Sequence, residues 1–213
     1  MTARSRPPAR RPRKRGGAAP GTPTRGALRV VAGEARGLRL DVPDGVTTRP
    51  TSDRVREAVF NALESLGVIE GARVLDAFAG SGALGIEALS RGADHATFVE
   101  TEASVRATIS ANLDSTGLTD RATVIGGDGA RHVSGSGLWG LVLLDPPYTY
   151  ELWDALLPEV AKGLGVEGVV VLESDRELTE HLADESEKDA FVTSARLMCI
   201  AHAATAVVMA LEA

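Results

Sequence analysis

Apolar runs and amphipathic segments alternate along most of the chain, from residue 73 to about residue 182. Short apolar runs are typical of buried strands, and apolar positions spaced three and four residues apart are typical of helices. Their alternation predicts an α/β fold in which helices cover a parallel sheet. The expected strands are 73–78, 95–99, 122–125, 138–144 and 168–172, and the expected helices are 53–66, 83–91, 103–115, 152–164 (bent or split at Pro158) and 177–182.

Two predicted hairpins flank this α/β region. Residues 28–42 are expected to form two short strands joined by a turn, which makes 27–50 an N-terminal β-hairpin extension. Residues 195–200 and 205–211 are consecutive predicted strands, and a hairpin of this kind pairs antiparallel. The main domain is expected to cover 51–213.

The charge is divided unevenly, although the whole chain of 213 residues has a net charge of −6. Residues 1–29 hold nine Lys and Arg and no acidic residue, which leaves 14 basic and 29 acidic residues in 30–213, a net charge of −15. Residues 1–26 have too little apolar content to fold and are expected to be a disordered basic arm. Such an arm suggests a polyanionic partner such as RNA, and the alternatives are a solubilising tail or a start codon placed too far upstream.

Composition argues against several classes of protein. The single cysteine, Cys199, cannot form an internal disulfide, which fits a reducing cytoplasm. The four histidines show no metal-ligand spacing, so we expect no metal site. There is no apolar run of membrane-spanning length, and no apolar segment follows the basic N-terminus as in a signal peptide. We therefore expect a cytoplasmic protein without a membrane partner.

The loop Asp145-Pro146-Pro147-Tyr148 follows the apolar run 141–144. Two consecutive prolines cannot extend the strand, so the chain must leave the sheet as a stiff loop. The carboxyl ends of strands are where open α/β sheets bind ligands. A carboxylate, backbone carbonyls and an aromatic ring in this place could hold a planar base that carries an exocyclic amine. The alternative is a rigid turn with an exposed tyrosine.

A second motif, Gly80-Ser81-Gly82-Ala83-Leu84-Gly85, matches G-x-G-x-x-G after a strand and at the start of a helix. Glycines let the backbone approach a ligand closely, and the helix N-terminus offers N–H donors. Glu100 follows Gly80 by 20 residues and could accept both hydroxyls of a ribose. A dehydrogenase is the obvious rival interpretation, and a purely structural turn is another.

Asp76 favours a cationic ligand over a dinucleotide, because an acid beside the glycine turn would repel a pyrophosphate. S-adenosylmethionine (SAM) carries an ammonium group and a sulfonium centre. Asp76 would hold its methionine end, unless it only orients N–H groups of the turn. Asp128 could meet the adenine amino group, or form an ordinary Asx turn. The predicted cofactor-binding residues are Asp76, Phe78, Gly80, Ser81, Gly82, Glu100 and Asp128.

The predicted chemistry is methyl transfer to the amine of a base. Asp145 and a proline carbonyl would each accept one N–H and draw the nitrogen towards tetrahedral geometry, so that its lone pair faces the methyl group. Tyr148 would stack on a base that has left its helix. Such catalysis consists of positioning and electrostatics, without a metal. The predicted catalytic residues are Asp145, Pro146, Pro147 and Tyr148.

The sequence resembles the RsmD family of bacterial methyltransferases, which act on the N2 amine of a guanine in 16S ribosomal RNA. The resemblance rests on four blocks in order, 29–33, 48–61, 76–85 and 145–148, of which Arg49-Pro50-Thr51-Ser52-Asp53-Arg54-Val55-Arg56-Glu57 is the specific one. It implies a seven-stranded, Rossmann-like SAM-dependent methyltransferase fold, mostly parallel, with a small N-terminal hairpin. It also implies catalysis by the Asp145 loop and a small-ribosomal-subunit partner.

Several basic residues near the predicted site are candidates for contacts to RNA phosphates. They are Arg29, Arg36, Arg49, Arg54 and Arg56. For the two that begin the helix 53–66, the alternative is a capped and solvated helix face. We expect a monomer.

Two other functions remain open. Asp-Pro-Pro-Tyr also occurs in methyltransferases acting on DNA adenine N6 or cytosine N4, although no segment here is long enough for a separate base-recognition domain. A non-catalytic RNA-binding ribosome assembly factor that keeps the fold is the alternative from another class.

Overall fold

A single mixed sheet with the strand order β3-β2-β1-β4-β5-β6 organises the fold. The computed structural model describes residues 28–43, 53–134, 139–147, 149–173 and 207–209. The strands are β1 Arg73–Asp76, β2 His95–Glu100, β3 Ala122–Gly126, β4 Trp139–Leu144, β5 Leu164–Leu172 and β6 Val207–Met209. Neighbouring strands from β3 to β5 pair parallel, and β6 pairs antiparallel with β5. The predicted α/β alternation is therefore confirmed.

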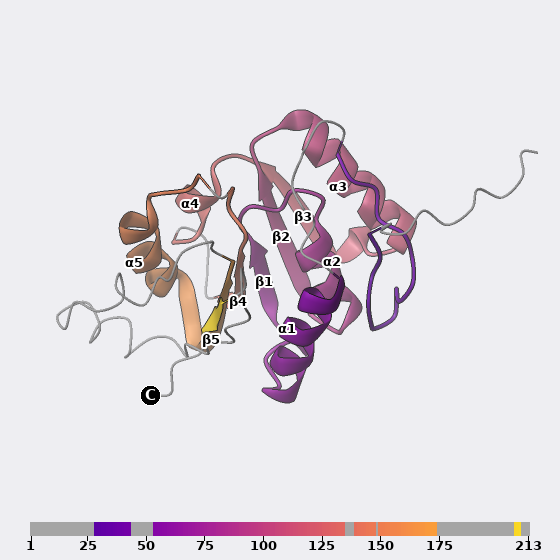
Figure 1. The fold of residues 1–213 in the computed structure, drawn as a ribbon, viewed down its shortest axis with the longest axis horizontal. Helices are drawn as coiled ribbons and strands as arrows, with labels where there is room; N and C mark the ends of the chain where they lie inside the picture. The colour runs from indigo at the N-terminus through magenta and orange to yellow at the C-terminus, as the bar shows by residue number, and fades with distance from the viewer. Residues whose placement is uncertain (1–27, 44–52, 135–138, 148, 174–206, 210–213) are drawn as a thin grey trace, which may run out of the picture.

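Helices cover both faces of this sheet (Figure 1). They are α1 Asp53–Ser65, α2 Ala83–Ser90, α3 Ala103–Thr116, α4 Gly129–His132 and α5 Trp153–Gly163, with a 3-10 turn η1 at Thr119–Arg121. Successive strand residues point to opposite faces, so Val74 of β1 joins the core under α1, α2 and α3, while Leu75 joins the core under α5. Strands buried on both faces explain the continuous apolar runs of the sequence.

The N-terminal segment packs on the α2 face. Residues 28–40 are joined by one antiparallel bridge, Arg29 to Arg39, and by flanking hydrogen bonds such as Val30 N to Leu38 O at 3.0 Å. Leu28, Val30 and Leu40 bury their side chains in the main core. The predicted hairpin thus takes the form of one bridge rather than two strands.

Several predicted elements differ from the structure or lie outside it. Six strands are described rather than seven, and the predicted strand 195–200 lies outside the described residues, as do the arm 1–26 and the helix 177–182. Of the two outcomes predicted at Pro158, a bend or a split of the helix, the split does not occur, since α5 runs through it as one element. The short α4 was not predicted.

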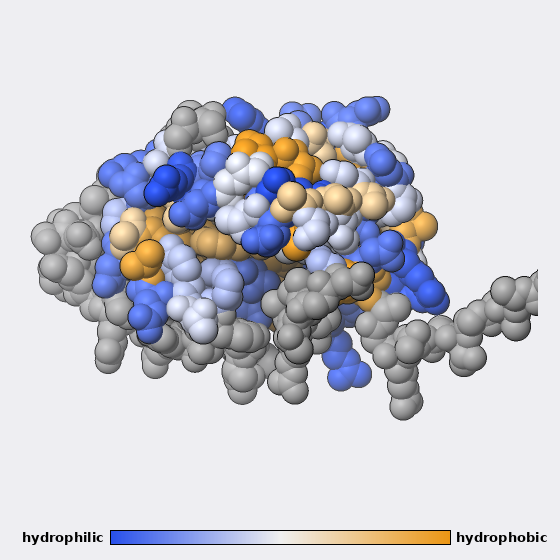
Figure 2. Space-filling model, turned by 90° about the horizontal axis from the view of Figure 1, so that it is seen from above, coloured by the Kyte–Doolittle hydropathy of each residue, from blue (hydrophilic) through white to orange (hydrophobic). Residues whose placement is uncertain are grey.

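The surface of the described residues is mixed in character. Hydrophobic groups occur among hydrophilic ones on the face seen from above (Figure 2). Among the described helices, none has both the length and the hydrophobicity that crossing a membrane requires.

Candidate active site

A cavity of about 530 Å³ lies beside the carboxyl ends of the central strands. The strand order reverses between β1 and β4, and such a switch point is where open α/β sheets bind ligands. The volume is within the range of about 300–1,000 Å³ that small-molecule sites occupy. The residues that line it come from the turn after β1, the ends of β2 and β3, the starts of α2 and α3, and the loop after β4. Leu28, Val42, Pro43 and Arg56 complete the described lining.

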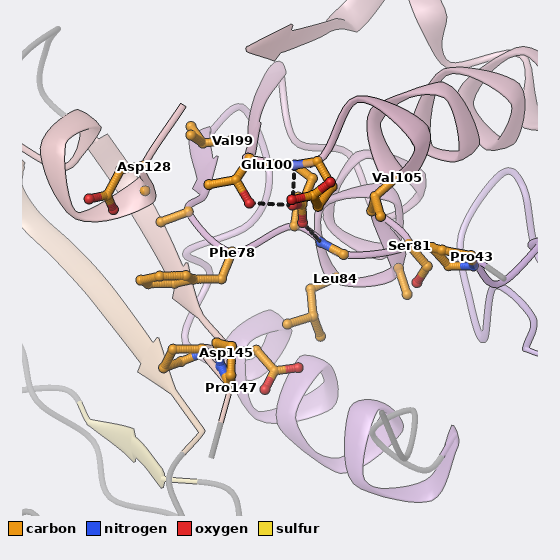
Figure 3. A pocket seen from close by; sticks show the side chains of 18 of the residues that line it. Pro43, Phe78, Ser81, Leu84, Val99, Glu100, Val105, Asp128, Asp145 and Pro147 are labelled. Carbon is orange, nitrogen blue, oxygen red and sulfur yellow. Dashed lines mark hydrogen bonds between the residues drawn. The ribbon is translucent and has the colours of Figure 1, made fainter. Parts of the chain in front are cut away.

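The loop after β4 and the glycine turn after β1 share this cavity. Asp145, Pro146 and Pro147 line it together with Gly80 and Ser81. In Figure 3 the Asp145 and Pro147 side chains lie below Phe78, with Glu100 on the other side of that ring. Two segments 65 residues apart in the chain are therefore brought to one place, as the proposed chemistry requires. The fourth predicted catalytic residue, Tyr148, lies outside the described residues.

Backbone hydrogen bonds fix the start and the end of this loop. Glu173 N donates to Leu144 O at 2.8 Å, which continues the ladder to the last residue of β4. Tyr150 N donates to Pro147 O at 2.8 Å and closes a turn three residues later. The Asp145 side chain is half-buried between these two anchors. Pro147 O uses one of its two acceptor positions in this turn, so either proline carbonyl has capacity to accept from a substrate.

The glycines of the G-x-G-x-x-G motif have different roles. Gly80 and Gly82 have φ angles of 51° and 80°, which side chains rarely adopt. Gly80 lines the cavity, and its N–H donates to Glu100 Oε2 at 3.2 Å. A Cβ on Gly85 would lie 2.3 Å from the Phe98 ring, so this glycine serves packing of α2 on β2. Gly80, Ser81, Ala83 and Leu84 line the cavity, whereas Gly82 and Gly85 do not.

Asp76 lies beneath the glycine turn and is buried. Its Oδ2 accepts a hydrogen bond from Gly85 N at 3.0 Å, and its buried Oδ1 has no partner among the described residues. Burial raises the pKa of Asp76 to about 7, the Gly85 N–H partly opposes this, and the charge of Glu100 adds to it. A hydrogen bond of the kind that the alternative interpretation predicts is therefore present, although its donor lies in α2 and not in the turn itself. Asp76 itself is not among the residues that line the cavity, so it could act on a bound ligand only from behind the turn.

Glu100 stands at the end of β2 with its carboxylate oriented by neighbours. Oε1 accepts from Glu102 N at 3.0 Å and from Thr101 Oγ1 at 3.1 Å. Arg106 Nη1 donates to the carbonyls of Glu100 at 2.9 Å and Thr101 at 2.6 Å. A Cβ on Gly126 would come within 2.9 Å of the same guanidinium. Sequence reasoning missed Arg106, which nothing in its local pattern distinguishes from a solvated helix residue.

Asp128 caps α4 and lines the cavity. Its Oδ1 accepts from Ala130 N at 3.0 Å, so the predicted Asx-type hydrogen bond is present. The next residue, Gly129, must be glycine, since a Cβ there would lie 1.8 Å from Ala77 O. This close approach, which the sequence did not reveal, sets α4 against the end of β1.

Among the charged residues that line the cavity, acidic ones predominate. Glu100, Glu102, Asp128 and Asp145 face one basic residue, Arg56. Such a set suits a cationic ligand and disfavours the pyrophosphate of a dinucleotide. The cavity therefore argues for SAM and against the dehydrogenase alternative.

Arg56 corrects a prediction, because its side chain is 1% exposed and cannot lie along an RNA backbone. It donates to Asp53 Oδ1 at 2.8 Å and to the carbonyl of Arg29, and its Nε lies 3.7 Å from Glu87. Glu87 is buried and was not singled out from the sequence.

The other predicted RNA contacts vary in exposure. Arg36 and Arg54 are exposed, and Arg29 is half-buried with Nη1 donating to Gly37 O at 3.0 Å. Arg49 lies outside the described residues.

The chain is similar to proteins that are named as methyltransferases. A family described as "Conserved hypothetical protein 95" matches residues 28–191. A Bacillus subtilis (strain 168) protein named "Putative rRNA methyltransferase YlbH" is 40% identical over 157 residues, 71% of this chain and 84% of that protein. The Escherichia coli (strain K12) "Ribosomal RNA small subunit methyltransferase D" is 39% identical over 155 residues, 71% and 77% of the two chains.

A solved structure shows the same architecture. The structure described as "Putative methyltransferase yhhF from Escherichia coli" superposes with a TM-score of 0.70 at 32% identity, covering 88% of this chain and 99% of that one.

Proposed function

The chain belongs to the RsmD family, whose description is "Conserved hypothetical protein 95", and we propose that it transfers a methyl group from SAM to the exocyclic N2 amine of a guanine in 16S ribosomal RNA. One observation carries the proposal. The Asp145-Pro146-Pro147 loop and the Gly80 turn with Glu100 line one cavity. A donor held at the turn and an amine held at the loop would therefore meet within it.

The residues at the turn fit SAM, which supplies an electrophilic methyl group when bound. Glu100 would accept the ribose hydroxyls, since its carboxylate is oriented by Gly80 N and Glu102 N. Asp128 would accept from the adenine amino group, and Phe78 would pack against the cofactor. The unpartnered oxygen of Asp76 would stabilise the positive charge of the methionine end from beneath the turn.

The loop residues would position the amine. The Asp145 carboxylate and a proline carbonyl would each accept one N–H, which leaves the nitrogen lone pair directed into the cavity. Tyr148 would stack on the base. Positioning of this kind contributes by removing the entropy cost of alignment, and the fixed acceptors stabilise charge as it develops on the nitrogen.

Basic residues outside the cavity would hold the RNA. Arg36 and Arg54 are exposed and could meet phosphates, as could Arg29 and Arg49. The arm 1–26 would add attraction that does not depend on sequence. We expect the protein to act as a monomer on the small ribosomal subunit.

The test is a methyl-transfer assay with tritiated SAM. Substrates are small subunits that lack the endogenous mark, free 16S rRNA and duplex DNA, and the product nucleoside is identified by mass spectrometry. We expect N2-methylguanosine from ribosomal substrate. Label confined to methyladenine or methylcytosine would favour the DNA alternative.

Two variants separate an enzyme from a non-catalytic RNA-binding factor. Asp145→Asn should lower kcat by about 100-fold or more, the size of effect seen when one transition-state hydrogen bond is removed. It should leave SAM and RNA binding within a few-fold of wild type. Asp120→Asn is the matched control, an exposed aspartate of η1 that does not line the cavity. Wild-type protein that binds RNA but never transfers label would support the assembly-factor alternative.

A further inference from the structure

Asn112 of α3 carries a buried amide that the proposed chemistry does not use. Only 1% of the residue is exposed. Burying an amide costs free energy unless its polar groups are paired. The side chain of Asn112 forms three hydrogen bonds, and every partner is a backbone group far away in the chain. Its contacts therefore join segments that the sequence keeps apart.

Two of these bonds hold the N-terminal segment. Asn112 Oδ1 accepts from Asp41 N at 2.7 Å, and Nδ2 donates to Asp41 O at 3.0 Å. The amide thus pairs with both backbone groups of one residue. The next two residues, Val42 and Pro43, line the cavity. Asn112 therefore fixes the chain just before it forms part of the cavity wall.

The third bond holds the glycine turn. Asn112 Nδ2 also donates to Ser81 O at 2.9 Å. Ser81 lies between Gly80 and Gly82 and lines the cavity itself. Because two carbonyls and one N–H surround the amide, only one orientation of it satisfies all three groups. This side chain therefore fixes the turn and the N-terminal segment relative to each other.

The two segments meet at one end of the cavity. In Figure 3, Ser81 and Pro43 lie at the opposite end from Asp128, and Glu100 lies between them. The proposed function assigns Asp128 to the adenine and Glu100 to the ribose of SAM. The end lined by Ser81 and Pro43 is then left for the amino-acid part of the cofactor.

We propose that Asn112 is a positioning residue, which shapes the amino-acid end of the cofactor site by tying the Ser81 turn to the segment that carries Val42 and Pro43. The inference rests on the proposed function, because SAM is the ligand assigned there. Asn112 does not belong to the described lining of the cavity, so it acts through the backbone of its partners. Without the amide the two walls can move apart. Affinity should then fall for a ligand that reaches this end, and not for one that stops at the ribose.

The test compares Asn112→Ala with wild type by calorimetry, using two ligands. One is SAM, and the other is 5′-methylthioadenosine, which keeps the adenine, the ribose and the sulfur but lacks the amino-acid part. The Kd for SAM should be about three- to tenfold weaker in the variant, and the Kd for 5′-methylthioadenosine should stay within about twofold of wild type. Asn61→Ala is the matched control, because Asn61 is exposed on α1 and its amide bonds Arg91. It should change neither Kd.

A second control separates positioning from a general loss of stability. Ile69 is buried in the main core ahead of β1, at the edge of the sheet opposite the cavity. Ile69→Ala removes core packing and lowers Tm. At a temperature at which all variants are folded, its Kd for SAM should equal that of wild type.

NMR provides a measurement on wild-type protein, which does not depend on the folding of any variant. The chain has two asparagines and no glutamine, so its spectrum contains two side-chain NH2 pairs. The Asn61→Ala variant assigns them. On addition of SAM, the pair of Asn112 should shift and exchange more slowly with water, while the pair of Asn61 should stay unchanged.

The possible results distinguish this inference from the proposed function. Equal losses of affinity for the two ligands, or an equal loss for SAM in Ile69→Ala, would overturn the inference, because general destabilisation would explain them. An unchanged Kd for SAM in Asn112→Ala, or an Asn112 signal that does not respond to SAM, would also overturn it and leave the proposed function intact. Wild-type protein that fails to bind SAM would overturn both proposals.

Discussion

Glu87 Oε1 accepts a hydrogen bond from Arg91 Nε at 2.8 Å, and both side chains are buried. The other oxygen of Glu87 accepts from Val31 N at 2.7 Å, while Oε1 also accepts from Ala32 N at 3.0 Å. One carboxylate of α2 thus holds the N-terminal segment, which contributes Leu28, Val42 and Pro43 to the cavity wall.

Glu87→Ala should destabilise the protein by about 3–5 kcal/mol, because it leaves a buried arginine and two backbone N–H groups without their acceptor. Glu64→Ala is the matched control. Glu64 is 63% exposed and accepts from the same Arg91 at 2.8 Å. Because its carboxylate is hydrated and the same nitrogen, Arg91 Nη1, also donates to Asn61 Oδ1 at 2.9 Å, the expected loss is only about 0–1 kcal/mol. Urea unfolding gives the free energy of unfolding of both variants. Equal losses in the two would contradict the central role of Glu87.

Asp76 should make stability depend on pH. Its pKa in the folded protein is raised from 3.8 to about 7, so the folded state holds a proton that the unfolded state has already lost. The resulting stabilisation is complete below about pH 4 and disappears as the pH rises through about 7. Each pKa unit corresponds to about 1.4 kcal/mol, so the total change is on the order of a few kcal/mol.

Asp76→Asn should flatten this profile, because asparagine offers Gly85 N an acceptor without a charge. Unfolding free energies at about pH 5 and pH 8 provide the measurement. Parallel profiles for the two proteins would show that another group is responsible. The same variant should weaken SAM binding at pH 8, where the wild-type carboxylate is ionised.

Gly85→Ala should cost about 1–3 kcal/mol, the usual penalty for overpacking a core, because its Cβ would meet the buried Phe98 ring at 2.3 Å. In Gly140→Ala the Cβ meets Ala72 Cβ at an ordinary 3.4 Å, so little change is expected. Thermal unfolding distinguishes the two. A destabilisation of equal size would refute the steric explanation.

Arg106→Gln should weaken SAM binding by about three- to tenfold, since its Nη1 holds the carbonyls of Glu100 and Thr101 beside the predicted ribose site. Arg54→Gln, an exposed change on α1, should leave SAM affinity unaltered. Calorimetric titration measures both. Unaltered affinity of the Arg106 variant would show that Glu100 is oriented without it.

Arg36→Gln and Arg54→Gln should each weaken RNA binding and reduce the slope of log K against log salt by roughly 0.7–0.9, as expected when one phosphate contact is lost. Arg73→Gln is the control, because Arg73 starts β1 at the edge opposite the cavity and stacks on Trp139. Filter binding over a range of salt concentrations provides the slopes. Identical slopes for wild type and all three variants would show that the RNA does not contact Arg36 or Arg54.

Most of the fold could be predicted because hydrophobic periodicity reflects burial directly. For example, the strands 95–100 and 139–144 coincide with apolar runs, and helices lie between the strands as the amphipathic segments predict. The edges of elements and the single bridge of the N-terminal segment could not be predicted, since these depend on which neighbour supplies a hydrogen bond. Pro158 shows that a local rule can leave two outcomes open, a bend or a split, and the structure excludes the split because α5 is one helix.

The sequence by itself determined the alternating order of strands and helices, the stiff Asp145 loop at a strand end and the glycine turn, because these follow from residue type and spacing along the chain. Only the tertiary structure decided which charges are buried and which groups meet. Arg56 and Arg54 look alike in sequence, yet one is enclosed with Glu87 and the other is exposed. The contact of Gly85 with Phe98 and the approach of Tyr150 to Phe78 depend on distances between segments remote in the chain, which a linear pattern does not contain.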